Sequence, residues 1–166
     1  MTKKLARLIF PFFCVLLLAP WPIAYAYDTV NAAEPPVQVT VAETTPGITA
    51  FGKAIGSVKP GDLFYVNASN SAADIDVNLY LTNASELIHN YRYMILEIGV
   101  YVQNNAGGWE KAALPDTYLT MRNGSVNCRL PGYARYRISV EGGSFYCLTA
   151  DETESEISPR FYLEVS

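Results

Sequence analysis

The sequence contains little histidine, cysteine or charge. Its 166 residues include one histidine, His89, and three cysteines, and only 17% of the residues are charged. Transition metals such as zinc bind to clustered cysteine and histidine, so this supply leaves little for such a metal centre. Acidic residues outnumber basic residues by 16 to 12, which gives a formal net charge of −4. Because nucleic-acid-binding domains present a basic face, we expect no nucleic-acid partner.

Apolar and aromatic residues are plentiful instead. Half of the residues are hydrophobic and 13% are aromatic, a composition that argues against disorder. The length is enough for one domain with a core and too short for two comfortable ones.

The first 26 residues are typical of a secretory signal peptide. Lys3, Lys4 and Arg7 precede the apolar run 8–18, and small residues precede a cleavage point after Ala26. A membrane anchor is the alternative, but a spanning helix needs about 20 apolar residues, which this run does not reach. No later apolar run is long enough to span a bilayer. We therefore expect a cleaved signal over 1–26 and a secreted or otherwise extracytoplasmic protein.

Two cysteines remain after that cleavage, Cys128 and Cys147. In an exported protein, two cysteines predict one disulfide. It would close a loop of about 20 residues and contribute ~3 kcal/mol in the chain-entropy description. The alternative is two thiols that do not bond to each other.

The mature chain alternates between apolar and polar residues with the period of β-strands. Residues 27–36 form a flexible lead-in rich in small residues and proline, and strands begin at Val37. The clearest alternation runs over 74–82, and the longest expected strand runs over 92–103. Between them, Asn83 and Glu86 have the spacing of a capping box, which predicts one or two helical turns.

The second half of the chain predicts two hairpins. The first turns at Asn123-Gly124, and the second turns at Glu141-Gly142-Gly143. Residues 104–116 are expected to form a long loop. The eight or nine strands, without helical crossovers, predict an all-β, two-sheet antiparallel sandwich over 37–166 with one short helix.

Two segments carry a resemblance to a known class of domain. Residues 59–67 (KPGDLFYVN) and 130–140 (LPGYARYRISV) are similar to strand entries of secreted bacterial immunoglobulin-like domains. The resemblance implies an immunoglobulin-like sandwich in an extracellular setting and carries no catalytic residues with it. It also implies that Tyr133 or Tyr136 serves as a tyrosine corner, with its hydroxyl bonded to the backbone.

No convincing catalytic or metal-binding set is present. His89 lies in the short helical connection and no Gly-x-Ser-x-Gly elbow occurs, so we expect neither an enzyme nor a cofactor. The acidic stretch 151–156 offers Asp151, Glu152 and Glu154 as weak calcium candidates. A solvated, self-repelling loop is the favoured interpretation of that stretch.

Aromatic side chains are the stronger indication of a binding surface. The alternation places Tyr80, Tyr93 and Tyr101, together with Tyr146 and Tyr162, on strand faces opposite the core. Trp109 follows two glycines in the expected long loop. We take Trp109, Tyr80, Tyr93 and Tyr101 as candidate ligand contacts, since such rings combine contact area with a polar tip. Cross-strand tyrosine pairs that only stabilise an outer face are the favoured alternative.

These observations predict a non-enzymatic secreted or cell-envelope module that binds a partner or has a structural role. The partner would be a protein or a glycan outside the cytoplasm. One alternative is a carbohydrate-binding module that uses surface tyrosine and tryptophan. Another is a subunit of an extracellular fibre or matrix that assembles through edge strands.

Overall fold

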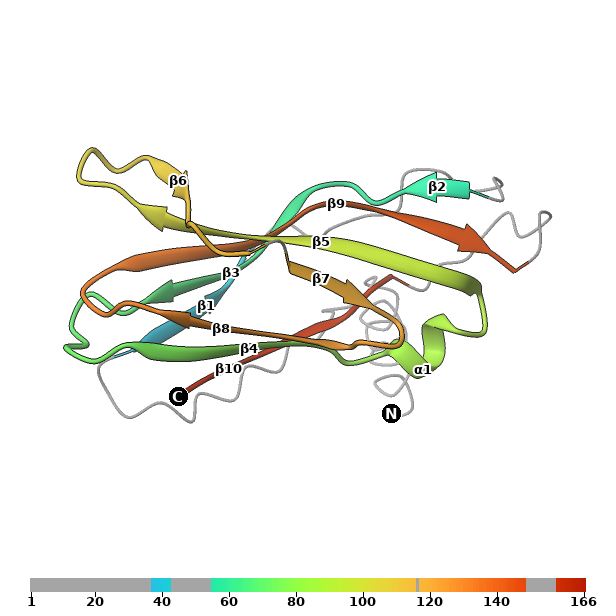
Figure 1. Cartoon of the computed structure of the whole chain (residues 1–166), viewed down its shortest axis with the longest axis horizontal. Helices are drawn as coiled ribbons and strands as arrows, with labels where there is room; N and C mark the ends of the chain where they lie inside the picture. The colour runs from blue at the N-terminus through green and yellow to red at the C-terminus, as the bar shows by residue number, and fades with distance from the viewer. Residues whose placement is uncertain (1–36, 43–54, 116, 149–157) are drawn as a thin grey trace, which may run out of the picture.

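The chain folds as a sandwich of two antiparallel sheets. The computed structural model describes residues 37–42, 55–115, 117–148 and 158–166, which contain ten strands and one short helix. Figure 1 shows the two sheets facing each other. The all-β sandwich expected from the alternation is confirmed. The predicted signal peptide 1–26 and lead-in 27–36 lie outside the described residues.

The larger sheet has seven strands, and its two longest lie at the centre. Its main order is β1 (Gln38–Val41), β3 (Gly61–Asn67), β9 (Arg135–Cys147), β5 (Tyr91–Gln103) and β6 (Trp109–Lys111). Two further short strands extend it, with β2 (Ile55–Ser57) paired to β9 and β7 (Thr117–Thr120) paired to β5.

The smaller sheet has three strands, ordered β10 (Phe161–Val165), β4 (Ile75–Leu81) and β8 (Ser125–Leu130). Helix α1 (Ala84–Leu87) links β4 to β5. No helix among the described residues is long and apolar enough to cross a membrane.

The core lies between the inner faces of the two sheets. On β4 the apolar residues Ile75, Val77, Leu79 and Leu81 are buried and alternate with more exposed polar ones. Strand β5 buries alternate residues from Met94 to Val100 in the same way. Side chains of a strand point alternately to its two faces, so the period-2 pattern decides which face each sheet buries.

The expected turn at Glu141-Gly142-Gly143 is wrong, because β9 runs through it without a break. Val140 pairs with Ile98 and Gly142 pairs with Glu97, which leaves Glu141 as the extra residue of a β-bulge. The bulge changes which side chains face the core, from even-numbered positions before it to odd-numbered positions after it. Close approach requires glycine at 143, since a Cβ there would lie 2.2 Å from the Ile95 carbonyl oxygen.

The hairpin expected at Asn123-Gly124 is also wrong. Strand β7 pairs with β5 in the larger sheet, whereas β8 pairs with β4 in the smaller one. The segment between them therefore carries the chain from one sheet to the other. A short polar turn between two alternating runs is compatible with both arrangements.

The tyrosine corner is confirmed at Tyr136. Tyr136 is buried, and its hydroxyl donates a hydrogen bond of 2.5 Å to the carbonyl oxygen of Pro131. Tyr133 is instead exposed, in a turn, with a positive φ of 56°. Tyr136 has this role because it lies on the core-facing side of β9, whereas Tyr133 precedes the strand.

Asn83 precedes α1 as expected, but its side chain does not cap the helix. It is buried, and its amide nitrogen donates to the carbonyl oxygen of Ser158 at 2.9 Å. Its amide oxygen accepts from the backbone N–H of Arg160, also at 2.9 Å. The side chain therefore ties the start of α1 to the segment that enters β10.

The predicted disulfide is wrong, because Cys128 and Cys147 are both thiols. Cys128 lies in the smaller sheet opposite Val77, and Cys147 lies in the larger sheet opposite Tyr91, at the start of β5. Strands β8 and β9 end at opposite ends of the sandwich (Figure 1). Both side chains are buried in the core, so spacing in the sequence did not indicate proximity in the fold.

Candidate ligand-binding face

Side chains from four strands meet on the outer face of the larger sheet. Tyr65 on β3 is opposite Arg137 on β9, Arg137 is opposite Tyr101 on β5, and Tyr101 is opposite Lys111 on β6. Residues directly opposite each other on neighbouring strands share a face of the sheet. Trp109, two residues before Lys111, joins them on that face. We call Tyr65, Tyr101, Trp109 and Arg137 the aromatic–arginine cluster.

The cluster is held by ring contacts. The guanidinium carbon of Arg137 lies 4.4 Å from the ring centre of Tyr101 and 5.4 Å from that of Trp109. The rings of Tyr65 and Trp109 are 5.9 Å apart and tilted by 43°. A cation over an aromatic face is attracted by the negative charge of the ring face, so these contacts fix the position of Arg137.

Trp109 is placed by a tight connection between β5 and β6. The expected loop 104–116 contains β6, which pairs Gln103 with Trp109. The Asn104 side chain accepts hydrogen bonds from the backbone N–H groups of Ala106 and Gly108, at 3.1 and 2.8 Å. Gly107 has a φ of +83°, which favours glycine. Trp109 therefore belongs to the sheet and not to a loop.

Asp62 joins β3 to β9 beneath the cluster. Its carboxylate accepts hydrogen bonds from the Tyr65 hydroxyl at 2.9 Å and from the Ser139 hydroxyl at 2.7 Å. The Nε of Arg137 lies 3.6 Å from the same carboxylate, which is an ion pair without a hydrogen bond.

Glu141, the bulged residue of β9, links β9 to β5 and β6, as Asp62 links β3 to β9. Its carboxylate accepts from the Tyr101 hydroxyl at 2.5 Å and from Lys111 Nζ at 2.7 Å. Its side chain crosses Gly99, where a Cβ would lie 2.5 Å from it. Burial would raise the pKa of Glu141, but the bonds from Lys111 and Tyr101 outweigh it and lower that pKa. The bond to Glu141, with burial, raises the pKa of Tyr101.

Two hollows flank the cluster. The first, the Tyr101 hollow, has a volume of about 500 Å³. It is lined by Pro60, Gly61, Asp62, Tyr101, Arg137, Ser139, Val140 and Glu141. The second, the Trp109 hollow, has a volume of about 360 Å³. It is lined by Gln38, Thr40, Tyr65, Val66, Asn67, Gln103, Trp109, Arg135 and Tyr136.

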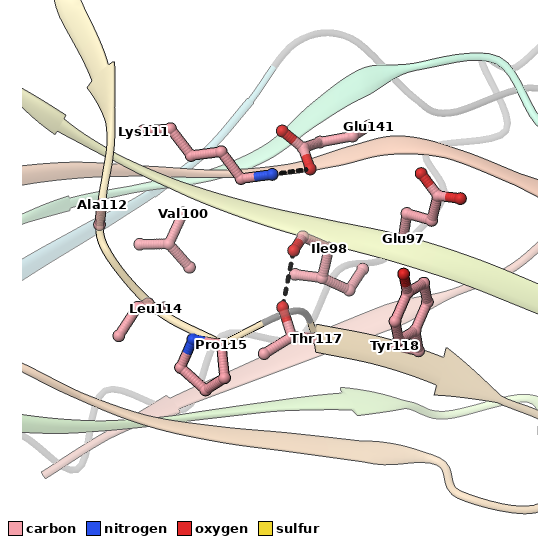
Figure 2. A pocket seen from close by; sticks show the side chains of 10 residues that line it. All are labelled: Glu97, Ile98, Val100, Lys111, Ala112, Leu114, Pro115, Thr117, Tyr118 and Glu141. Carbon is pink, nitrogen blue, oxygen red and sulfur yellow. Dashed lines mark hydrogen bonds and ion pairs between the residues drawn. The ribbon is translucent and has the colours of Figure 1, made fainter.

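A third hollow lies at the edge of β5, where β6 ends and β7 begins (Figure 2). Its volume is about 80 Å³, room for a few water molecules at ~30 Å³ each. Figure 2 shows the Lys111–Glu141 pair on one side and, on the other, Thr117 Oγ1 donating to the Ile98 carbonyl oxygen at 2.6 Å. The hollow is too small to hold a sugar ring, and its hydrogen bonds reinforce the edge of the sheet.

The other candidate tyrosines lie elsewhere. Tyr80 is on the smaller sheet, with its ring 5.8 Å from that of Tyr162 and its hydroxyl donating to Glu164 at 3.1 Å. That hydrogen bond, with burial, raises the pKa of Tyr80. Tyr93 shares the outer face with Tyr101 but lies eight residues away along β5, stacked on Tyr146 at 6.1 Å. Tyr80 and Tyr93 therefore each belong to a cross-strand tyrosine pair. This is the arrangement of the favoured alternative, in which such pairs stabilise an outer face.

Sequence reasoning missed two members of the cluster, Arg137 and Tyr65, and the neighbouring carboxylate of Glu141. Arg137 alternates with the buried Tyr136 and Ile138, which placed it on an outer face, but nothing local indicated its ring contacts. Tyr65 and Glu141 were not recognised as site residues, because strand pairing brings their partners to them. Such pairing is not readable from one sequence.

The remaining candidates do not join this face. His89 is exposed in the turn after α1. Asp151, Glu152 and Glu154 lie outside the described residues. Within the part of the chain that is described, no group of three or more histidine, cysteine or acidic side chains could hold a metal ion.

The chain matches no protein-family model, and no curated protein is similar to it in sequence.

Proposed function

We propose that this protein is an exported, non-enzymatic binding module that holds a glycan on the outer face of its larger sheet. The observation that carries the proposal is the aromatic–arginine cluster with a hollow on each side. Sugar rings have apolar C–H faces that pack on aromatic rings, and hydroxyl groups that bond to amides and charged side chains. The signal-like segment 1–26 supports a ligand outside the cytoplasm.

The carboxylates near the cluster favour binding over glycan hydrolysis. A glycosidase needs a carboxylic acid with a raised pKa to protonate the leaving group. The pKa of Glu141 is lowered, and both of its oxygens accept hydrogen bonds from neighbouring side chains. Asp62 accepts two hydrogen bonds from side chains as well. Both carboxylates therefore position the cluster, and Glu141, whose pKa is lowered, does not fit the role of the proton donor.

A glycan array probed with the purified mature protein tests the proposal. Trp109→Ala is expected to weaken the binding of any retained glycan by at least about ten-fold, since stacking area in the site is lost. Tyr80→Ala is the matched control, because its aromatic pair lies on the opposite sheet. Glycan binding that survives Trp109→Ala, or an array with no bound glycan, would overturn the proposal. A protein ligand held on this face would overturn it in favour of a protein-binding module.

A further inference from the structure

We infer that the glycan is acidic and that Arg135 holds its anionic group at the Trp109 hollow, with Arg137, which lines the neighbouring Tyr101 hollow, adding positive charge beside it. The inference rests on the proposed function and names the class of ligand for the same face. It is carried by two arginines whose hydrogen-bonding capacity is not used within the described structure.

Arg135 and Arg137 are two residues apart on β9 and face the same side of the sheet. Among the described residues, neither guanidinium makes a hydrogen bond. Arg137 contacts rings and lies 3.6 Å from Asp62, and Arg135 is exposed. Each guanidinium carries five N–H donors in a planar fork that fits a carboxylate or a sulfate.

The Nε of Arg137 is a particular case. It is buried and makes no hydrogen bond, whereas the carboxylate nearest to it already accepts from Tyr65 and Ser139. Most buried polar atoms in proteins have a hydrogen-bond partner, so this Nε is an exception: its position is set by the ring contacts and by Asp62 at 3.6 Å. The ring contacts hold the planar group in place before a ligand arrives, which lowers the entropy lost on binding.

The two hollows differ in charge. The Tyr101 hollow is lined by the two carboxylates of Asp62 and Glu141 and by the single guanidinium of Arg137, so its charged groups are net negative and disfavour an anion. The described lining of the Trp109 hollow has no carboxylate and has Arg135 as its charged group. In a chain with a formal net charge of −4, this is a local basic site on an acidic protein. The anion therefore belongs in the Trp109 hollow.

The rest of that hollow suits a sugar. Tyr65 and Trp109 supply ring surface, and Gln38, Asn67 and Gln103 supply amides for hydroxyl groups. Its volume of about 360 Å³ is at the lower end of the range for ligand pockets, ~300–1,000 Å³. This allows one or two sugar units with the acidic group next to Arg135.

Calorimetry with an acidic oligosaccharide panel tests the inference. The panel contains a galacturonic-acid oligomer, a sialylated oligosaccharide and a sulfated oligomer, and the control is the galacturonic-acid oligomer with its carboxyl groups reduced to alcohols. At least one acidic probe is expected to bind about ten-fold or more tightly than the neutral control, because the hydrogen bonds to it are charge-assisted. Its affinity should fall as salt rises. Comparison of the carboxylated probes with the sulfated probe identifies which anionic group the protein binds.

The variants separate this inference from the proposed function. Arg135→Gln is expected to remove the preference for the acidic probe, and Arg137→Gln to reduce it. Arg129→Gln should leave it unchanged, because Arg129 is exposed on the smaller sheet and paired with Asp74. Circular dichroism confirms that each variant is folded.

Equal affinity for the neutral control, or an acidic preference that survives Arg135→Gln, would overturn the inference. Neither of these two results would contradict the proposed glycan-binding function. Absence of binding to every acidic probe also overturns the inference, while the array and Trp109→Ala decide the proposed function separately.

Discussion

The guanidinium of Arg137 lies 4.4 Å from the ring centre of Tyr101, its register partner on the neighbouring strand. The Tyr101 hydroxyl is in turn held by Glu141, 40 residues away in the sequence. Arg137 is therefore fixed through its ring contacts on β5 and β6 and through Asp62 on β3. A surface built on four neighbouring paired strands, β3, β9, β5 and β6, is more rigid than one built on loops.

Arg137→Met should lower the free energy of unfolding by about 1 kcal/mol, the usual worth of a partly desolvated cation–π contact. Arg137→Lys should recover only part of this loss, because an ammonium lacks the planar face that stacks on Tyr101. Urea denaturation followed by circular dichroism measures both. Arg129→Met is the control, since an exposed ion pair contributes little. Equal stability of the two methionine variants would contradict the role assigned to Arg137.

Asn83→Ala should destabilise the protein by ~2 kcal/mol, because it removes two hydrogen bonds between a buried side chain and the segment entering β10. Asn127→Ala is a matched control, since its amide nitrogen donates an exposed hydrogen bond to Asn78. Denaturation midpoints in urea compare the two. The description fails if Asn83→Ala is as mild as Asn127→Ala.

Both described cysteines should resist alkylation in the folded protein and react once it is unfolded, without a reductant. Burial and then the nearby Asp76 raise the pKa of Cys128 to about 11, so almost none of it is thiolate at pH 8. Cys147 is shielded by burial. Intact mass after labelling, with and without denaturant, counts the reacted thiols. A Cys128–Cys147 disulfide in the denatured sample would show that the structure has assigned these residues wrongly.

Acidification should weaken the outer face through Glu141. Its pKa is lower in the folded protein than in the unfolded chain, so its contribution to stability is complete above the unfolded value. That contribution is lost as the pH falls through the lower, folded value. The denaturation midpoint should therefore drop more between pH 7 and strongly acidic conditions in the wild type than in Glu141→Gln. Parallel pH profiles of the two proteins would refute the linkage.

The alternation of β4 and β5 was readable from the sequence because burial on one face imposes it directly. The continuity of β9 was not readable in this way. The bulge at Glu141 shifts the buried apolar positions from even to odd numbers, and such a shift beside two glycines is also typical of a turn. Likewise, nothing local to Asn123-Gly124 distinguishes a hairpin from a crossing between sheets.

The candidate site was only partly predictable for the same reason. Alternation correctly placed Tyr80, Tyr93 and Tyr101 away from the core, yet three outward tyrosines can lie on two sheets. Pairing of β5 with β6 and β9 brought Tyr101 to Trp109 and Arg137, and pairing of β4 with β10 took Tyr80 to Tyr162.

The one-sided strands of an all-β sandwich follow from the order of the amino acids, because the period-2 burial of apolar side chains is a local property. The composition also shows few histidine and cysteine residues and an acidic net charge. The separation of Cys128 from Cys147 and the contacts of Arg137 with Tyr101 and Trp109 emerge from the folded arrangement instead. Those relationships depend on strand order and register, which arise from contacts between residues distant in the sequence.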